Sequence, residues 1–178
     1  MSSPQYSTPT KLIHWLTAIL VLVAFIYGPG GSETRVYSAS RDFDRQLHET
    51  LGLCVLALSV IRLLWRAADK RPAPEDGARW MRRTASAVQV ILFALLFIVP
   101  LTAISGAWLE GHPLTLLQSV TIAPPIQPSH ELGATIAELH GWLGDVILWV
   151  AGLHAAAALF HHYVLKDNVL RRMLPSRG

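Results

Sequence analysis

The chain alternates between long apolar blocks and shorter polar segments. A helix needs about 20 mainly apolar residues to cross a hydrocarbon core of about 30 Å. Four blocks approach or exceed that length, and they cover residues 12–27, 47–65, 84–109 and 139–165. We therefore predict four membrane-spanning helices, joined by polar segments that include a loop over residues 110–138.

The first block is short, and its flanking residues define where the helix begins and ends. Ser7 is a suitable N-cap, and Pro9 suits the first turn of a helix, so we expect the span to cover residues 8–27. Glycines and a proline at positions 28–31 form a strong helix breaker. A cleaved signal peptide is the alternative, but the block lacks a small-x-small cleavage site and carries His14 and Trp15 near its start.

Composition narrows the class of protein. Of 178 residues, 52% are hydrophobic and 15% are charged, against about a quarter charged in ordinary soluble domains. These values exclude a disordered chain, because disordered segments are polar and highly charged. A single cysteine, Cys54, excludes a disulfide framework and a cysteine-rich zinc or iron–sulfur site. We predict an all-α, integral membrane four-helix bundle that forms one domain over residues 1–178.

The distribution of basic residues predicts the orientation in the membrane. Eleven of the 15 Lys and Arg residues lie in the N-terminus, in the loop after the second block or in the C-terminal segment. Three others, Arg35, Arg41 and Arg45, lie in the loop after the first block. Because cytoplasmic segments of membrane proteins are rich in Lys and Arg, we expect a bacterial inner-membrane protein with both termini in the cytoplasm. This asymmetry explains the pI of about 9.4 without binding to nucleic acid.

Histidines occupy two depths of the predicted bundle. His14 lies near the cytoplasmic end of the first span, and His48 lies at the outer end of the second. The fourth span carries His140 and His154, which fourteen helical steps separate by about 21 Å but leave within about 40° of one face. The spacing predicts two pairs, His48 with His140 and His14 with His154, as two b-type hemes in a bundle core would require.

The residues four positions after these histidines support the same interpretation. A porphyrin on a helical histidine lies over the next turn, so that position must be small. The four positions are Ala18, Gly52, Gly144 and Ala158. The alternative is that the histidines cross-link helices by hydrogen bonds, since small residues are common in membrane helices. His130 is also followed by an alanine but falls in the predicted 110–138 loop, and no intramembrane carboxylate or thiol completes a zinc or copper site.

Arg62 follows His48 by fourteen residues and is expected at the cytoplasmic end of the same face. Its guanidinium could bind the propionates of the inner heme. The alternative is an arginine whose charged end reaches the membrane surface from the end of a helix.

Several stretches of the chain resemble the bacterial cytochrome b561 family. They are His14-Trp15, His48, the segment RLLWR at 62–66 and, above all, the C-terminal run GLHAAAALFHHYVLKDNVLRRMLP. The resemblance covers nearly the whole chain and is weak over residues 110–138. It implies a four-helix bundle in the inner membrane with two b hemes, the outer one held by His48 and His140 and the inner one by His14 and His154.

Within the family, the chain is most similar to the superoxide oxidase type. Such members take electrons from superoxide at the periplasmic face and pass them through both hemes to ubiquinone. The resemblance therefore implies a superoxide:quinone oxidoreductase with superoxide and ubiquinone as its partners. We expect Arg35, Arg41 and Arg45 to steer the superoxide anion to the outer heme. Alternatively, these arginines are solvated loop charges, offset by nearby carboxylates.

Candidate groups for quinone reduction follow the inner heme ligand. Quinone carbonyls need hydrogen-bond donors and a source of protons, which His161, His162 and Lys166 could supply. The alternative is an aromatic and basic anchor at the membrane surface. Two other functions stay open at the level of sequence: a b-type subunit that links a dehydrogenase or hydrogenase partner to the quinone pool, and a non-redox, histidine-lined metal transporter.

Overall fold

The computed structural model describes residues 5–69, 78–117 and 119–174, and these form mainly long helices. The four longest are α1 (Thr8–Ile26), α3 (Asp42–Ala68), α4 (Arg79–Leu109) and α5 (His130–Phe160), which continues as the π-helical segment η2 (His161–Leu165). Among the described residues, these four helices are the ones long and apolar enough to cross a membrane. The prediction of an all-α membrane bundle is confirmed.

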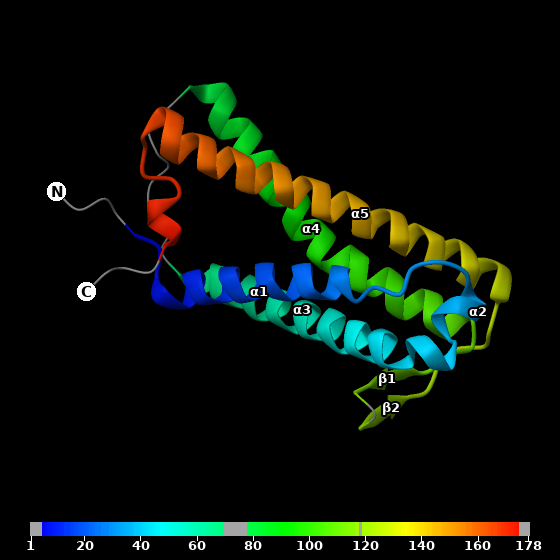
Figure 1. Cartoon of the computed structure of the whole chain (residues 1–178). Coiled ribbons are helices and arrows are strands. Elements are labelled where there is room, and N and C mark those ends of the chain that lie inside the picture. The colour runs from blue at the N-terminus through cyan, green and yellow to red at the C-terminus, as the bar shows by residue number, and fades with distance from the viewer. Residues whose placement is uncertain (1–4, 70–77, 118, 175–178) are drawn as a thin grey trace.

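The short elements that precede α5 lie at one end of the bundle, and both termini lie at the other (Figure 1). Between α1 and α3 are α2 (Glu33–Val36) and the 3-10 helix η1 (Ala39–Arg41). Between α4 and α5 are the antiparallel strands β1 (Leu114–Leu116) and β2 (Val120–Ile122). A further 3-10 helix, η3 (Arg171–Met173), follows η2. We call the end with α2 and the strands the outer end and the end with the termini the inner end.

Three helices begin earlier than predicted. The second span was expected from residue 47 and begins at Asp42, the third was expected from 84 and begins at Arg79, and the fourth was expected from 139 and begins at His130. His130 therefore lies in a helix, and its assignment to a loop was wrong. The cause is the same in all three cases, because the first turn of each helix contains polar residues and lies before the apolar block that hydropathy detects. The expected end of α1 before Gly28 is confirmed.

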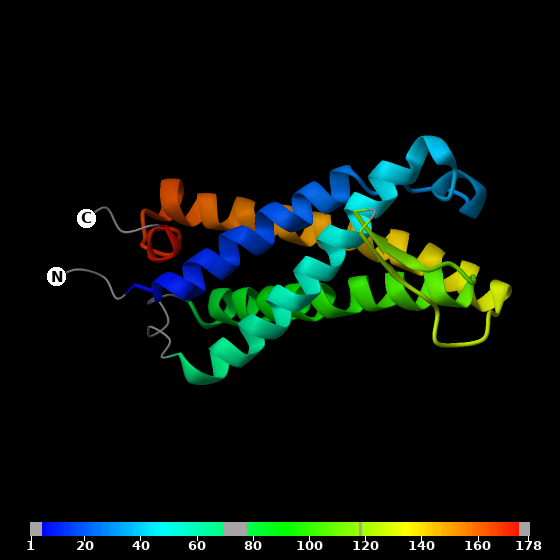
Figure 2. The ribbon, with the colours of Figure 1, turned by 90° about the horizontal axis from the view of Figure 1, so that it is seen from below.

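The helices associate as two pairs, α1 with α3 and α4 with α5. In Figure 1 the pairs diverge toward the inner end, and Figure 2 shows α1 and α3 crossing each other. The buried hydrophobic cluster joins the pairs at mid-height. It consists of Val55 of α3, Leu95 and Leu96 of α4 and Ile147 of α5. Packing between the two pairs is thus concentrated in a single layer.

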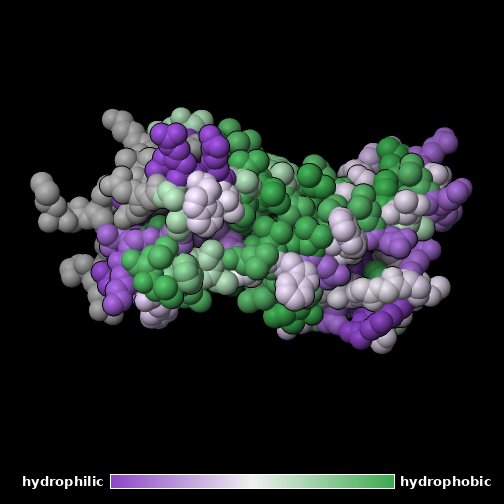
Figure 3. All heavy atoms as spheres, turned by 90° about the horizontal axis from the view of Figure 1, so that it is seen from above, coloured by the Kyte–Doolittle hydropathy of each residue, from purple (hydrophilic) through white to green (hydrophobic). Residues whose placement is uncertain are grey.

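The outer surface of the helices is apolar. The face seen in Figure 3 is hydrophobic across its middle and hydrophilic toward both ends. Large side chains such as Trp149 and Leu153 are 75% and 68% exposed, as expected for residues that face lipid. The cations predicted for the cytoplasmic side fall at the inner end wherever they are described, whereas Lys70, Arg71 and Arg177 lie outside the described residues.

Candidate heme-binding site

The outer histidine pair joins α3 to α5. The ring centroids of His48 and His140 are 5.9 Å apart, and the ring planes are inclined by 79°. Each ring is also fixed by a helix other than its own. Nδ1 of His48 donates a hydrogen bond to the carbonyl oxygen of Ala24 in α1 (2.7 Å), and Nδ1 of His140 donates to that of Val99 in α4 (2.9 Å). All four long helices therefore contribute to this level.

These two hydrogen bonds determine which ring nitrogen can bind a metal. A carbonyl oxygen only accepts, so Nδ1 of each ring carries the proton and Nε2 keeps its lone pair. An Nδ1–H bonded to a backbone carbonyl is the usual support for a histidine that ligates through Nε2. The outer pair thus has each Nδ1 occupied by a backbone carbonyl, which leaves Nε2 as the atom that can ligate iron.

The inner pair joins α1 to α5. The ring centroids of His14 and His154 are 6.5 Å apart, and the planes are inclined by 76°. Metal–imidazole bonds of about 2 Å on opposite sides of one ion separate the two ring centroids by about 6 Å. Both histidine pairs have this spacing, so the donor set fits a bis-histidine heme at each level.

The positions four residues after the outer histidines leave space for a macrocycle. A Cβ atom added at Gly52 or at Gly144 would meet no other atom within 4 Å. The buried cluster lies between the histidine levels, since Val55 follows His48 by seven residues and Ile147 lies midway between His140 and His154. Side-chain packing is therefore tightest between the two levels at which hemes are expected.

Arg62 lies at the level of the inner pair. Its positive charge is close enough to interact with both His14 and His154. In the described part of the chain, no carboxylate forms a salt bridge with it. A half-buried guanidinium without an acidic partner suits an anionic group such as a heme propionate.

Two of the three outer arginines are paired with carboxylates. Arg41 contacts Asp44 at 3.1 Å, and Arg45 binds both Asp42 and Glu49, the latter at 2.8 Å. Arg35, in α2, forms no salt bridge with any residue that the structure describes. The structure therefore distinguishes Arg35 from Arg41 and Arg45 as a charge that an anion could reach.

The candidate quinone residues lie together at the inner end, in and just after η2. Nδ1 of His161 is hydrogen-bonded to the carboxylate of Asp167. Nδ1 of His162 is buried and has no hydrogen-bond partner among the described residues. Lys166 is exposed and has a left-handed backbone conformation, with φ 56°. The segment thus holds the His161 imidazole, which Asp167 orients, and the His162 imidazole, whose Nδ1 has no hydrogen-bond partner among the described residues.

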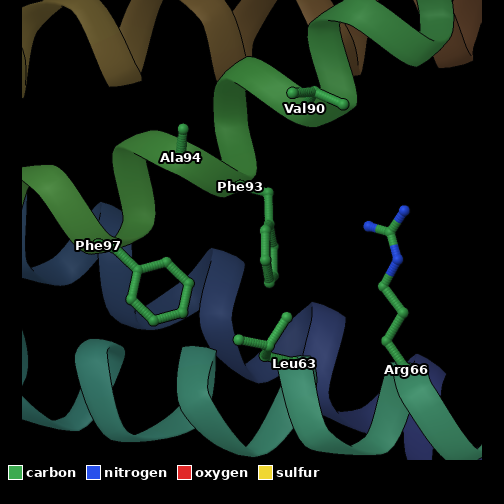
Figure 4. Close-up of a pocket in the computed structure, with 6 residues that line it drawn as sticks. All are labelled: Leu63, Arg66, Val90, Phe93, Ala94 and Phe97. Carbon is green, nitrogen blue, oxygen red and sulfur yellow. The ribbon is translucent and has the colours of Figure 1, made fainter.

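A groove between α3 and α4 was not predicted from the sequence. It has a volume of about 320 Å³ and is drawn in Figure 4. Its lining consists of Leu63, Arg66, Val90, Phe93, Ala94 and Phe97. The Arg66 guanidinium lies 5.8 Å from the centroid of the Phe93 ring. Leu63 is about half exposed and Val90 somewhat more, so the groove opens toward lipid near the inner end. The two phenylalanines one turn apart were the available sequence signal.

Known proteins resemble this chain over nearly its full length. Residues 5–176 match the family model for prokaryotic cytochrome b561. The chain is 29% identical to cytochrome b561 homolog 1 of Escherichia coli K12, over 97% of this chain and 98% of that protein. It is 29% identical to a probable superoxide oxidase, CybB, of Yersinia pestis, over 97% of both chains. It is 31% identical to cytochrome b562 of Cereibacter sphaeroides, over 98% of both chains.

The family match agrees with the membrane bundle. Members are b-type cytochromes, and their function is electron transfer through heme. A non-redox transporter does not fit this family. The chain belongs to the prokaryotic cytochrome b561 family.

Proposed function

We propose that this protein is a di-heme cytochrome that moves electrons between the two surfaces of the bacterial inner membrane, with both termini in the cytoplasm. The observation that carries the proposal is the presence of two histidine pairs at two levels of one bundle, with ring centroids 5.9 and 6.5 Å apart. A b-type heme held by two imidazoles supplies one-electron transfer without an open coordination position.

The chain's own residues would hold and orient the two groups. His48 and His140 are the proposed outer ligands, and His14 and His154 are the proposed inner ligands. The carbonyl groups of Ala24 and Val99 keep Nε2 of each outer ring available. Ala18, Gly52, Gly144 and Ala158 leave room beside the four rings. The guanidinium of Arg62 would bind a propionate at the inner level.

The proposed electron donor is superoxide at the outer end. Two superoxide anions each lose one electron and become O₂, while one quinone gains both electrons and two protons and becomes a quinol. The similarity of this chain to the probable superoxide oxidase of Yersinia pestis supports this donor. Arg41 and Arg45 are neutralised by carboxylates, so we assign most of the attraction of the anion to Arg35.

The proposed electron acceptor is ubiquinone at the inner end. His161, oriented by Asp167, would donate a hydrogen bond to a quinone carbonyl and pass on a proton. His162 and Lys166 are further donors in the same segment. The groove lined by Phe93 and Phe97 is a second candidate site for the quinone ring. Variants of His161 and of Ala94 distinguish binding at η2 from binding in the groove.

The experiment that tests the proposal measures heme content first and electron transfer second. Purified protein should contain about two hemes b per chain by pyridine hemochrome assay, and His48→Leu or His154→Leu should contain about one. His130→Leu, which changes an exposed histidine outside both pairs, is the matched control.

Stopped-flow mixing with superoxide, with and without ubiquinone, then tests the donor and the acceptor. We expect superoxide to reduce the cytochrome and ubiquinone to re-oxidise it. A single heme in the wild type would overturn the di-heme proposal. Two hemes that superoxide does not reduce would overturn only the proposed donor, and would favour a b-type subunit that serves a dehydrogenase or hydrogenase partner.

A further inference from the structure

A second group of ligating side chains lies at the outer end, apart from the four heme histidines. It consists of Glu33, Glu110 and His112, whose ligand atoms all lie within 4.8 Å of one another. Glu33 is the first residue of α2, Glu110 is the C-cap of α4, and His112 follows two residues later. Residues from two distant parts of the chain therefore converge on one point.

The local sequence explains how the end of α4 contributes two ligands. Gly111 has φ 87°, a left-handed conformation that glycine adopts without strain. Its N–H donates to the carbonyl of Trp108, and the N–H of His112 donates to that of Ala107. This pair of bonds is the Schellman motif, which ends a helix and reverses the chain. The turn brings the imidazole of His112 back beside the carboxylate of Glu110.

Glu110 is the unusual member of the group. It is only 8% exposed, yet its carboxylate has no hydrogen bond or ion pair with any described residue. Helix α5 covers it at Gly133, where an added Cβ would lie 2.8 Å from Cγ of Glu110. Burial and the neighbouring charge of Glu33 both raise the pKa of Glu110. A carboxylate on a largely covered residue, with neither a hydrogen bond nor an ion pair, is a group that a bound cation would stabilise.

We propose that Glu33, Glu110 and His112 bind a divalent transition-metal ion, and that Zn²⁺ fits the group best. Two carboxylate oxygens and one imidazole nitrogen are a ligand set that Zn²⁺ uses, with the fourth position left for water. The imidazole disfavours Mg²⁺ and Ca²⁺, and the absence of sulfur from the group disfavours Cu⁺. The two carboxylates balance the charge of the ion.

The surroundings hold the site in a geometry close to that needed for binding. Nε2 of His112 already lies 2.7 Å from a carboxylate oxygen of Glu33. The His112 ring stacks on Tyr37, with centroids 3.5 Å apart, and the Arg45 guanidinium lies 5.2 Å from the Tyr37 ring centroid. Little movement is needed for the metal to replace the His112–Glu33 hydrogen bond. Binding would tie the loop that carries α2 to the end of α4.

Zinc binding to the purified, heme-loaded protein tests this inference. After removal of metals with a chelator, equilibrium dialysis against Zn²⁺ should load about one ion per chain. Glu110→Gln and His112→Ala should each weaken binding by at least about tenfold. Glu131→Gln, which changes an exposed carboxylate in the first turn of α5, is the matched control and should bind as the wild type does.

The heme spectrum of each variant shows whether the bundle is intact, independently of zinc. X-ray absorption at the zinc edge should show nitrogen and oxygen ligands, with the signature of one imidazole that is lost in His112→Ala. Equal zinc affinity in the wild type and Glu110→Gln, or no zinc bound by the wild type, would overturn the proposal. Neither result would bear on the heme ligands, because none of the three residues belongs to the two histidine pairs.

Discussion

Nδ1 of His48 donates a 2.7 Å hydrogen bond to the carbonyl oxygen of Ala24, across the contact between α3 and α1. The bond keeps the proton on Nδ1 and leaves the lone pair on Nε2, and the ring centroid of His140 lies 5.9 Å from that of His48. A buried ring that was free to turn or to change tautomer would present a lone pair only part of the time. The packing of α1 on α3 therefore prepares the outer histidine as a ligand.

A first prediction concerns the space beside the outer pair. Gly144→Leu should remove the outer heme, because its side chain would occupy the position over which the macrocycle must lie. We expect heme content to fall from about two to about one per chain. Gly141→Leu is the control. A Cβ there also meets no atom within 4 Å, but one helical step of about 100° turns the position away from the face that carries His140 and Gly144. Equal heme content in both variants would contradict the assignment.

A second prediction concerns the close contact between α4 and α5. Gly133→Ala places a Cβ 2.8 Å from Glu110 and 3.0 Å from the carbonyl carbon of Leu109. Overpacking against backbone costs about 1–3 kcal/mol, so we expect a lower midpoint of thermal unfolding. Gly152→Ala, in the same helix with open space at its Cβ, should leave the midpoint equal or higher.

A third prediction separates the three outer arginines. Arg35→Ser should slow reduction of the cytochrome by superoxide by about tenfold at low ionic strength, because charge steering acts through accessible cations. Arg41→Ser should have a smaller effect, since Asp44 already neutralises that guanidinium. Stopped-flow rates measured over a range of salt concentrations check this. An unchanged rate and salt dependence in the variant with all three arginines replaced by serine would refute steering.

A fourth prediction distinguishes the two places proposed for quinone. His161→Ala should slow re-oxidation of the reduced cytochrome by ubiquinone by about 100-fold if that imidazole supplies the proton. Asp167→Asn should act in the same direction, because the carboxylate orients the ring. Ala94→Trp would fill the groove between α3 and α4 instead. If only Ala94→Trp slows re-oxidation, the quinone binds in the groove and the assignment of His161 is wrong.

A fifth prediction concerns pH and Glu110. Because the pKa of Glu110 is raised in the folded protein, the folded state holds this proton more tightly than the unfolded state. The free energy of unfolding should therefore fall as pH rises from the usual carboxyl range through the raised pKa. The other charged groups that act on this carboxyl are Glu33, His112 and His130. Thermal unfolding in the presence of a chelator should show this loss in the wild type but not in Glu110→Gln, and Zn²⁺ should reverse it.

Local features of the chain were enough to predict the class of fold and the arrangement of four histidines as two pairs at two levels. Apolar length indicates spans, and the fixed rise and rotation of an α-helix convert the spacing of His140 and His154 into two levels on one face. The same hydropathy argument placed the start of α5 nine residues late, since polar first turns carry no apolar signal.

Contacts between distant segments could not be read from the sequence. The carbonyl of Val99 has no side-chain signature, yet it orients a histidine 41 positions away. Glu33 and His112 are 79 positions apart, and they meet only because α2 folds back over the end of α4. Whether Arg35 or Arg45 carries an uncompensated charge depends likewise on which carboxylates lie beside each of them. Helical periodicity depends on residues a few positions apart, so it can be read from the sequence. The hydrogen-bond partners of the histidines, the pairing of arginines with carboxylates and the meeting of Glu33 with His112 depend on how the helices pack.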